Sequence, residues 1–109
     1  MHELAITESV VAGVCEHVGD AKVTRVVLEI GKLSAVMPEA VRFCFDVCAK
    51  GTGLEGATLD ILETPGRCRC RTCNAEFQLE DSIALCQCGS ADLEFMSGQQ
   101  LLIKSVEVA

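Results

Sequence analysis

Three observations predict an α+β fold in which two helices cover a small mixed sheet and a cysteine-rich module is inserted. Segments with helical and strand periodicity alternate before residue 65. Five of the eight cysteines then fall within residues 68–88. An apolar, strand-like segment follows at 101–108. Because such a strand needs a sheet to pair with, we expect it to return to the strands that precede the cysteines.

The first two elements are indicated by a change of hydrophobic period. Apolar residues recur at helical spacing from Ile6 to Val18, which predicts an amphipathic helix that ends at Gly19-Asp20. From Lys22 to Ile30 apolar residues alternate and β-branched residues are frequent, which predicts a half-buried strand stopped by Gly31.

A second helix and the remaining strands follow. Pro38 suits the first turn of a helix, and Lys50-Gly51 is a suitable C-terminal stop. The inner stripe of this helix is Val41, Cys44, Phe45 and Cys48. A strand is expected at 57–63, broken by Pro65-Gly66 just before the cysteines, and a short strand at 92–96.

Composition limits the size and the partners of the protein. A chain of 109 residues, half of them apolar, can bury one modest core beside one small module. The net charge of −7 disfavours nucleic acid and anionic membrane surfaces and favours a cationic ligand or a basic partner. The first twenty residues contain no Lys or Arg, unlike a secretory signal, and no apolar run is long enough to span a membrane. We therefore expect a cytoplasmic protein.

The clustered cysteines have the spacing of a metal site. Cys70 and Cys73 form a C-x-x-C pair, and twelve residues later Cys86 and Cys88 form a C-x-C pair followed by Gly89. Two such pairs can place four thiolates around one tetrahedral Zn²⁺ and leave no open position, so the expected site is structural. The predicted organisation is an α+β domain of residues 1–65 and 95–109 with a zinc-ribbon-like, zinc-binding module at 66–94.

Several alternatives stay open for the cysteines. Cys68 is a fifth thiol that could replace one ligand of the set, because the C-x-C pair is one residue shorter than an ordinary knuckle. Iron in a rubredoxin-like site and a redox dithiol are the competing chemistries. Arginines 67, 69 and 71 are expected to offset the charge of the thiolates. Cysteines 15, 44 and 48 lie on apolar helical stripes and are expected to pack as small hydrophobic residues.

The N-terminus offers a second set of ligands. In the opening stretch Met1-His2-Glu3, the terminal amine, the amide and imidazole nitrogens of His2 and the Glu3 amide can reach one metal ion. Square-planar nitrogen geometry selects Ni(II) or Cu(II). Taken alone, this signal is weak, and a solvated, frayed terminus is the favoured explanation of the histidine. The other histidine, His17, is expected to be a partly buried structural residue at the flank of the first helix.

Taken in order, these segments resemble one known family. The opening MHEL, then LEIGKL, PEAVRFCFD, GTGLEGATL, the cysteine pairs and CGSADLEF closely resemble the HypA/HybF family of hydrogenase nickel-incorporation proteins, over essentially the full chain. The C-x-C pair departs from the C-x-x-C that this family usually has at that place.

The resemblance implies a nickel metallochaperone, not an enzyme, that serves the maturation of NiFe hydrogenase. By position, His2 corresponds to the family's nickel ligand, assisted by Met1 and Glu3, and the paired cysteines to ligands of structural Zn(II). The implied partners are the GTPase HypB and the hydrogenase large subunit precursor, and a homodimer stays open. The main alternatives are a zinc-ribbon adaptor for proteins or nucleic acid and a small iron–thiolate electron carrier.

Overall fold

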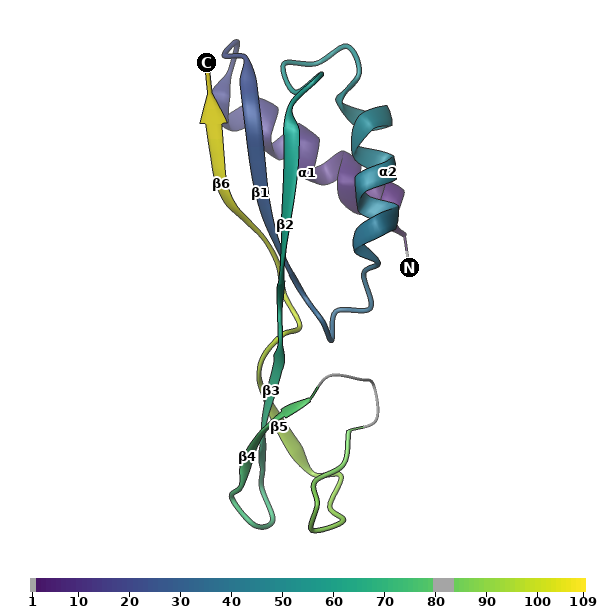
Figure 1. Ribbon diagram of the computed structural model, residues 1–109, viewed down its shortest axis with the longest axis vertical. Helices are drawn as coiled ribbons and strands as arrows, with labels where there is room; N and C mark the ends of the chain where they lie inside the picture. The colour runs from purple at the N-terminus through teal and green to yellow at the C-terminus, as the bar shows by residue number, and fades with distance from the viewer. Residues whose placement is uncertain (1, 80–83) are drawn as a thin grey trace.

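A computed structural model describes residues 2–79 and 84–109, and the chain is elongated, with extents of 53 × 21 × 17 Å. The elements follow the order α1 (Glu3–Val18), β1 (Val23–Gly31), α2 (Pro38–Ala49), β2 (Thr58–Thr64), β3 (Gly66–Cys70), β4 (Glu76–Leu79), β5 (Leu93–Ser97) and β6 (Leu101–Val108). Figure 1 shows two parts along the long axis. The helical part contains α1, α2, β1, β2 and β6, and the cysteine part contains β3, β4 and β5 with their turns.

The larger sheet is mixed, as the sequence predicts. Its strand order is β2-β1-β6, with β1 parallel to β2 and antiparallel to β6. Leu28 of β1 lies between Ile61 of β2 and Ile103 of β6 in the register. The prediction that the last strand returns to the first sheet is therefore confirmed, and so is the α+β fold class.

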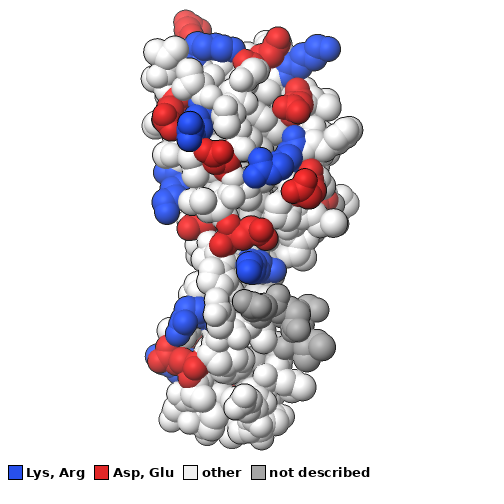
Figure 2. All heavy atoms as spheres, viewed as in Figure 1, with Lys and Arg blue, Asp and Glu red and all other residues white. Residues whose placement is uncertain are grey.

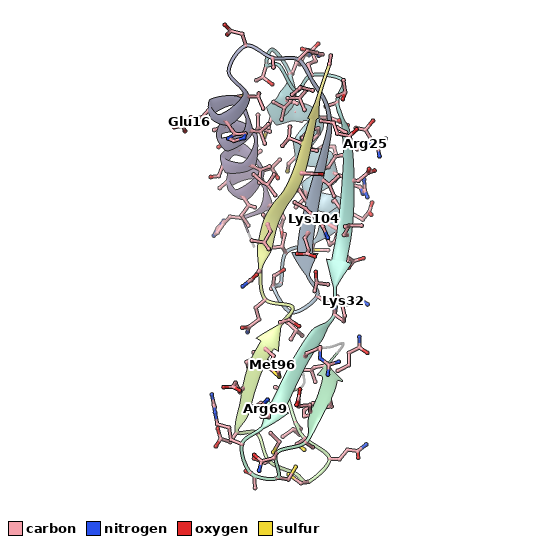
Figure 3. All side chains as sticks on the ribbon, turned by 90° about the vertical axis from the view of Figure 1, so that its left-hand side faces the viewer. Glu16, Arg25, Lys32, Arg69, Met96 and Lys104 are labelled. Atoms are coloured by element: carbon pink, nitrogen blue, oxygen red, sulfur yellow. The ribbon has the colours of Figure 1, made fainter. Side chains whose placement is uncertain are left out.

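Both helices cover one face of this sheet, because each has one apolar stripe. The core contains Val10, Val11 and Val14 of α1, Val41, Phe45 and Ala49 of α2, and Val23, Val26, Leu28, Ile30, Leu54 and Leu59. Thr7 is also buried, and its hydroxyl donates to the Glu3 carbonyl at 2.7 Å, so the polar atom is satisfied within the helix. In Figure 3 Arg25 lies on the face away from α1, where it pairs with Asp60 at 3.0 Å.

The smaller sheet has the order β4-β3-β5, all antiparallel. The sequence interpretation missed β4 and did not assign residues 66–70 to a strand. The signal for β3 was present, because Gly66, Cys68 and Cys70 alternate with two arginines, and the structure buries the first set and exposes the arginines. β5 ends at Ser97, so the smaller sheet extends a few residues past position 94, where the sequence analysis placed the end of the inserted module.

The two parts meet at a narrow waist where backbones pass within contact distance. The Gly31 amide donates to the Gln100 carbonyl at 2.8 Å, and the Leu33 amide donates to the Gly98 carbonyl at 2.8 Å. A Cβ atom at Gly31 would lie 2.0 Å from the Gly98 oxygen, which no side chain can tolerate. Leu33 itself packs against the buried cluster of the cysteine part. The waist therefore depends on the close approach of Gly31 and Gly98 and on the packing of Leu33 against the cysteine part.

No helix among the described residues is long and apolar enough to cross a membrane. Figure 2 shows acidic and basic side chains interspersed over the helical part on the face in view, with no large basic area. On the same face, the end of the cysteine part shows no charged side chain.

Candidate metal centres

The structure brings four sulfur atoms together at the end of the cysteine part. The Sγ atoms of Cys70, Cys73, Cys86 and Cys88 all lie within 4.8 Å of one another. Cys70 Sγ is 3.7 Å from Cys88 Sγ, and Cys73 Sγ is 3.6 Å from Cys86 Sγ. A tetrahedral Zn²⁺ with bonds of about 2.3 Å requires sulfurs about 3.8 Å apart. The two measured separations fit that requirement without rearrangement.

Two turns of different length place these sulfurs. Cys70 ends β3 and Cys73 follows in the turn to β4, whereas Cys86 and Cys88 belong to a loop before β5. The residue after each pair has a left-handed backbone, with φ of +64° at Asn74 and +91° at Gly89. Asn and Gly are the residues that most readily adopt this conformation. The shorter C-x-C pair therefore ends in the same kind of turn as the ordinary C-x-x-C pair.

Hydrogen bonds hold the two turns against each other. The hydroxyls of Thr72 and Ser90 are 2.9 Å apart, and the Cys86 amide donates to the Ser90 carbonyl at 2.9 Å. The Arg71 amide donates to the Asp92 carbonyl at 2.9 Å. The Thr72–Ser90 and Arg71–Asp92 contacts join residues 18 and 21 positions apart, whereas the Cys86–Ser90 bond closes the second turn itself. The two longer-range contacts connect the turn that carries Cys70 and Cys73 to the loop that carries Cys86 and Cys88.

The four thiols differ in their readiness to ionise. The Cys73 amide points at the Cys70 sulfur at 3.5 Å and lowers the pKa of Cys70 to about 6. At Cys88 the Ser90 amide acts in the lowering direction, but hydrogen bonds with Cys86 and Cys70 outweigh it and raise the pKa to about 11. Neighbouring thiols that share protons in this way form one coupled group. Such a group gains from a divalent cation, which stabilises all four thiolates together.

Two of the neighbouring arginines lie beside carboxylates. Arg69 pairs with Glu76 at 3.6 Å and with Glu94 at 3.8 Å, and Arg71 pairs with Asp92 at 3.0 Å. Their charges are thus already matched by carboxylates across the smaller sheet. The expectation that these arginines offset the charge of the thiolates stays a prediction.

The other cysteines lie outside the four-sulfur group. Cys68 is fully buried in a cluster with Leu79 and Leu93, and burial raises the pKa of its thiol. In the helical part Cys15 and Cys48 are partly buried against the core, as expected for thiols that pack as small hydrophobic residues. Cys44, one turn before Cys48 on α2, is also partly buried.

The second predicted site is at the N-terminus. Met1 lies outside the described residues. His2 is exposed and occupies the N-cap position of α1, where its carbonyl accepts from the Ile6 amide at 3.0 Å. The Glu3 carboxylate accepts from the Met37 amide at 3.2 Å, and this bond lowers the pKa of Glu3. In Figure 1 the N-terminus lies beside the start of α2, well away from the cysteine turns.

The contact between Glu3 and Met37 was not anticipated from the sequence. It joins residues 34 positions apart, and no local pattern points to it. An indirect signal existed, because Pro38 predicts a helix start, and the amides there need acceptors. The acidic residue that supplies the acceptor belongs to a different helix, and only the fold brings it there.

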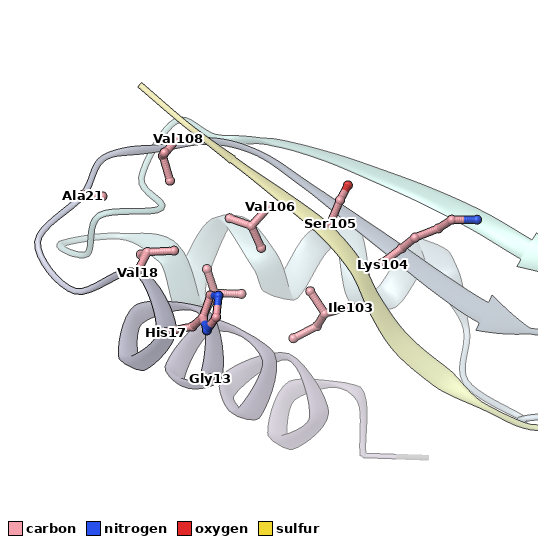
Figure 4. A pocket seen from close by; sticks show the side chains of 10 residues that line it. Gly13, His17, Val18, Ala21, Ile103, Lys104, Ser105, Val106 and Val108 are labelled. Atoms are coloured by element: carbon pink, nitrogen blue, oxygen red, sulfur yellow. The ribbon is translucent and has the colours of Figure 1, made fainter.

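His17, the second histidine, is not the partly buried residue that the sequence predicts. It is exposed and lines an open pocket of about 600 Å³ between α1 and β6. Figure 4 shows its imidazole beside Gly13, with Ile103 and Val106 pointing toward the same space from β6. The absence of a side chain at Gly13 leaves this side of the imidazole uncovered. The periodicity of the sequence placed His17 correctly on α1. It could not predict that α1 leaves part of β6 uncovered, which is why His17 is exposed.

Comparison with known proteins identifies the group to which the chain is related. The family described as hydrogenase/urease nickel incorporation, metallochaperone, hypA matches residues 1–108. The chain belongs to the HypA family. This is a family of metallochaperones for nickel incorporation during hydrogenase maturation, not a family of enzymes.

Individual relatives of the HypA family agree over nearly the full chain. A hydrogenase maturation factor HypA from Nostoc punctiforme is 56% identical over 108 residues, which cover 99% of this chain and 96% of that protein. A HypA from Geotalea uraniireducens is 44% identical, with 99% of each chain covered. The solution structure of the Ni metallochaperone HypA from Helicobacter pylori superposes with a TM-score of 0.70 at 25% identity, covering 99% of this chain and 97% of that one.

Proposed function

We propose that this HypA-family protein binds Ni(II) through Met1, His2 and Glu3 and delivers it to the large subunit precursor of NiFe hydrogenase. The observation that carries this proposal is the position of His2 as the exposed N-cap of α1 in a chain of a nickel-incorporation family. The ligands are the terminal amine, the His2 amide and imidazole nitrogens and the Glu3 amide nitrogen. The nickel ion is cargo in this scheme.

The start of α1 suits amide ligation. The first four amides of a helix have no acceptor within the helix, so those of His2 and Glu3 are free of helical hydrogen bonds. Amide nitrogens that lose their protons to a metal are negative, and negative charge is favoured at a helix N-terminus. The Glu3 carboxylate is engaged with the Met37 amide, which leaves the Glu3 backbone as the donor.

We assign structural Zn(II) to Cys70, Cys73, Cys86 and Cys88. The sulfur separations support this assignment, and four protein ligands leave no position for exchange. The buried position of Cys68 among leucines supports a packing role for that thiol and not a ligand role. A closed thiolate site stabilises the cysteine part, whereas an open site at a chain terminus can exchange its ligands one at a time.

The proposed partners are the GTPase HypB and the large subunit precursor, and the proposed compartment is the cytoplasm. Thiolate zinc sites and unpaired thiols are typical of reducing compartments. We further propose the division into an α+β nickel-binding domain of residues 1–65 and 95–109 and a zinc-binding module of 66–94. The separation of the larger and smaller sheets supports this division. A homodimer is compatible with it.

Nickel titration of untagged protein tests the site. His2→Ala is expected to weaken Ni(II) binding more than about 100-fold, because it removes the imidazole that closes the chelate. His17→Ala is the matched control, since His17 is the other exposed histidine and lies at the far end of α1. An extension that blocks the terminal amine is expected to act like His2→Ala. Unchanged affinity in both the His2 variant and the extended protein would rule out the terminal site.

A further inference from the structure

The two helices leave an open groove on the side away from the sheet. It has a volume of about 430 Å³ and is lined by Leu4, Glu8, Val11, Ala12, Cys15, Val47, Cys48 and Thr52. In Figure 1 α1 passes next to α2 and crosses behind it. Both helices contribute their second apolar stripe to the groove, since their first stripes face the sheet.

Large apolar side chains are exposed in this groove and next to it. Val47 (60% exposed) and Leu4 (49%) line the groove, and Phe43 (74%) lies one turn before Val47 on α2, outside the lining. Phe43 and Val47 are four residues apart on α2 and therefore share one face of the helix. Single exposed apolar residues are ordinary, but a group of them beside a groove marks a binding surface. Phe43 contributes nothing to the core, which is built on Phe45 from the opposite face of α2.

The surroundings of the groove are acidic. Glu8 lines it, and Asp46 precedes Val47 on α2. α1 contains no Lys or Arg, and Glu16 points outward from it in Figure 3. The one arginine of α2, Arg42, faces β2, where its guanidinium donates to the Leu59 carbonyl at 2.8 Å. Basic charge close to the groove comes from Lys50, just beyond the end of α2.

We propose that this groove, between α1 and α2, binds an amphipathic helix of a partner protein with an apolar face flanked by Lys or Arg. A groove between two helices with anchors at i and i+4 spacing fits a third helix, whereas no strand edge borders it to take an extended peptide. The carboxylates select basic flanks. A second copy of this chain fits less well, because each copy carries a net charge of −7.

This groove lies close to the nickel site proposed above. Leu4, at one end of the groove, is two residues from His2. A helix docked in the groove therefore lies beside the segment to which we assign nickel. The proximity of the docked helix to nickel rests on the proposed nickel site. The binding of the helix to the groove does not depend on that site.

A synthetic peptide is the direct test. The probe is a fluorescein-labelled helix of about 16 residues made of Leu and Lys, with Leu on one face at i, i+3, i+4 and i+7 spacing. Its binding to untagged protein is followed by fluorescence anisotropy. Phe43→Ser is expected to raise the dissociation constant about tenfold, because Phe43 shares the face of Val47 and truncation of an aromatic interface residue has effects of this size. Leu102→Ser is the matched control, because Leu102 is 46% exposed on β6, outside the groove.

Three results would overturn the inference. The first is equal binding of the probe to the Phe43→Ser variant and to the unaltered protein. The second is that a peptide with Glu in place of Lys binds as tightly as the probe. The third is that a scrambled peptide with no apolar face binds as tightly as the probe. Self-association abolished by Phe43→Ser but not by Leu102→Ser would also overturn it, in favour of a second copy. Nickel titration of the Phe43→Ser variant keeps the two proposals separate, since unchanged nickel binding is expected there.

Discussion

The helical part and the cysteine part bury different kinds of side chain. The core of the helical part is aliphatic and aromatic, and it draws on both helices and on the larger sheet. The buried cluster of the cysteine part contains three cysteines, Cys68, Cys70 and Cys86, with Leu79 and Leu93. A cluster this small releases little free energy on burial, because the hydrophobic contribution scales with apolar area.

The difference shows how each part is stabilised. The helical part has the ingredients of an independent hydrophobic core. The cysteine part brings four thiols together at a coupled site, and only a metal ion can turn that arrangement into a net stabilisation. Under the proposed zinc assignment, four thiols of the cysteine part serve as ligands, whereas Cys68 there and Cys15 and Cys48 in the helical part pack as small hydrophobic groups.

The largest expected effect is the loss of the metal. Cys73→Ser is expected to lower zinc affinity more than about 100-fold, since even the loss of a hydrogen bond to a ligand costs 10- to 100-fold. Zinc content measured by mass spectrometry and amide exchange should show loss of protection in β3, β4 and β5, with β1 and β2 retained. Cys44→Ser is the control, because that thiol lies in α2. Full zinc content in the Cys73 variant would contradict the assigned ligand set.

A smaller effect is expected at the waist that joins the parts. Gly31→Ala should destabilise the protein by about 2–3 kcal/mol, because its Cβ would collide with the Gly98 carbonyl and the backbone cannot withdraw cheaply. Gly13→Ala is the control. It meets no atom within 4 Å and lies inside α1, so it should stabilise the helix by roughly 0.5–1 kcal/mol. Urea unfolding followed by circular dichroism measures both changes, and equal values would show that the waist is not tightly packed.

The smallest effect concerns the thiols of the helical part. Burial raises the pKa of Cys48, and the neighbouring charges of Glu8 and Cys44 raise it further. Since the thiolate is the reactive form, alkylation of Cys48 should increase only as the pH rises above the ordinary thiol range. Glu8→Gln removes a negative charge, lowers this pKa and should speed alkylation a few-fold at pH 8. Peptide mass mapping measures the rate at Cys48, with Cys15 in the same protein as the internal reference.

Much of the fold could be predicted because its signals are local. The apolar stripe of α1, the alternation in β1 and the proline that begins α2 each lie within one segment, and each element was found there. β3 was missed although its alternation is equally local, since its cysteines were interpreted only as ligands. The burial of His17 was predicted wrongly because burial depends on how far α1 extends over β6.

By itself, the sequence determined which chemical groups are available: a histidine behind the N-terminal methionine, two cysteine pairs with their turn residues, and the periods of the helices and strands. These depend on neighbours in the chain, so they can be read without a fold. The tertiary structure alone decided which distant groups meet. It set the 3.6 and 3.7 Å sulfur separations, the bond from the Met37 amide to Glu3, and the open groove between α1 and α2. Each of these depends on packing between segments far apart in the chain, for which no local pattern exists.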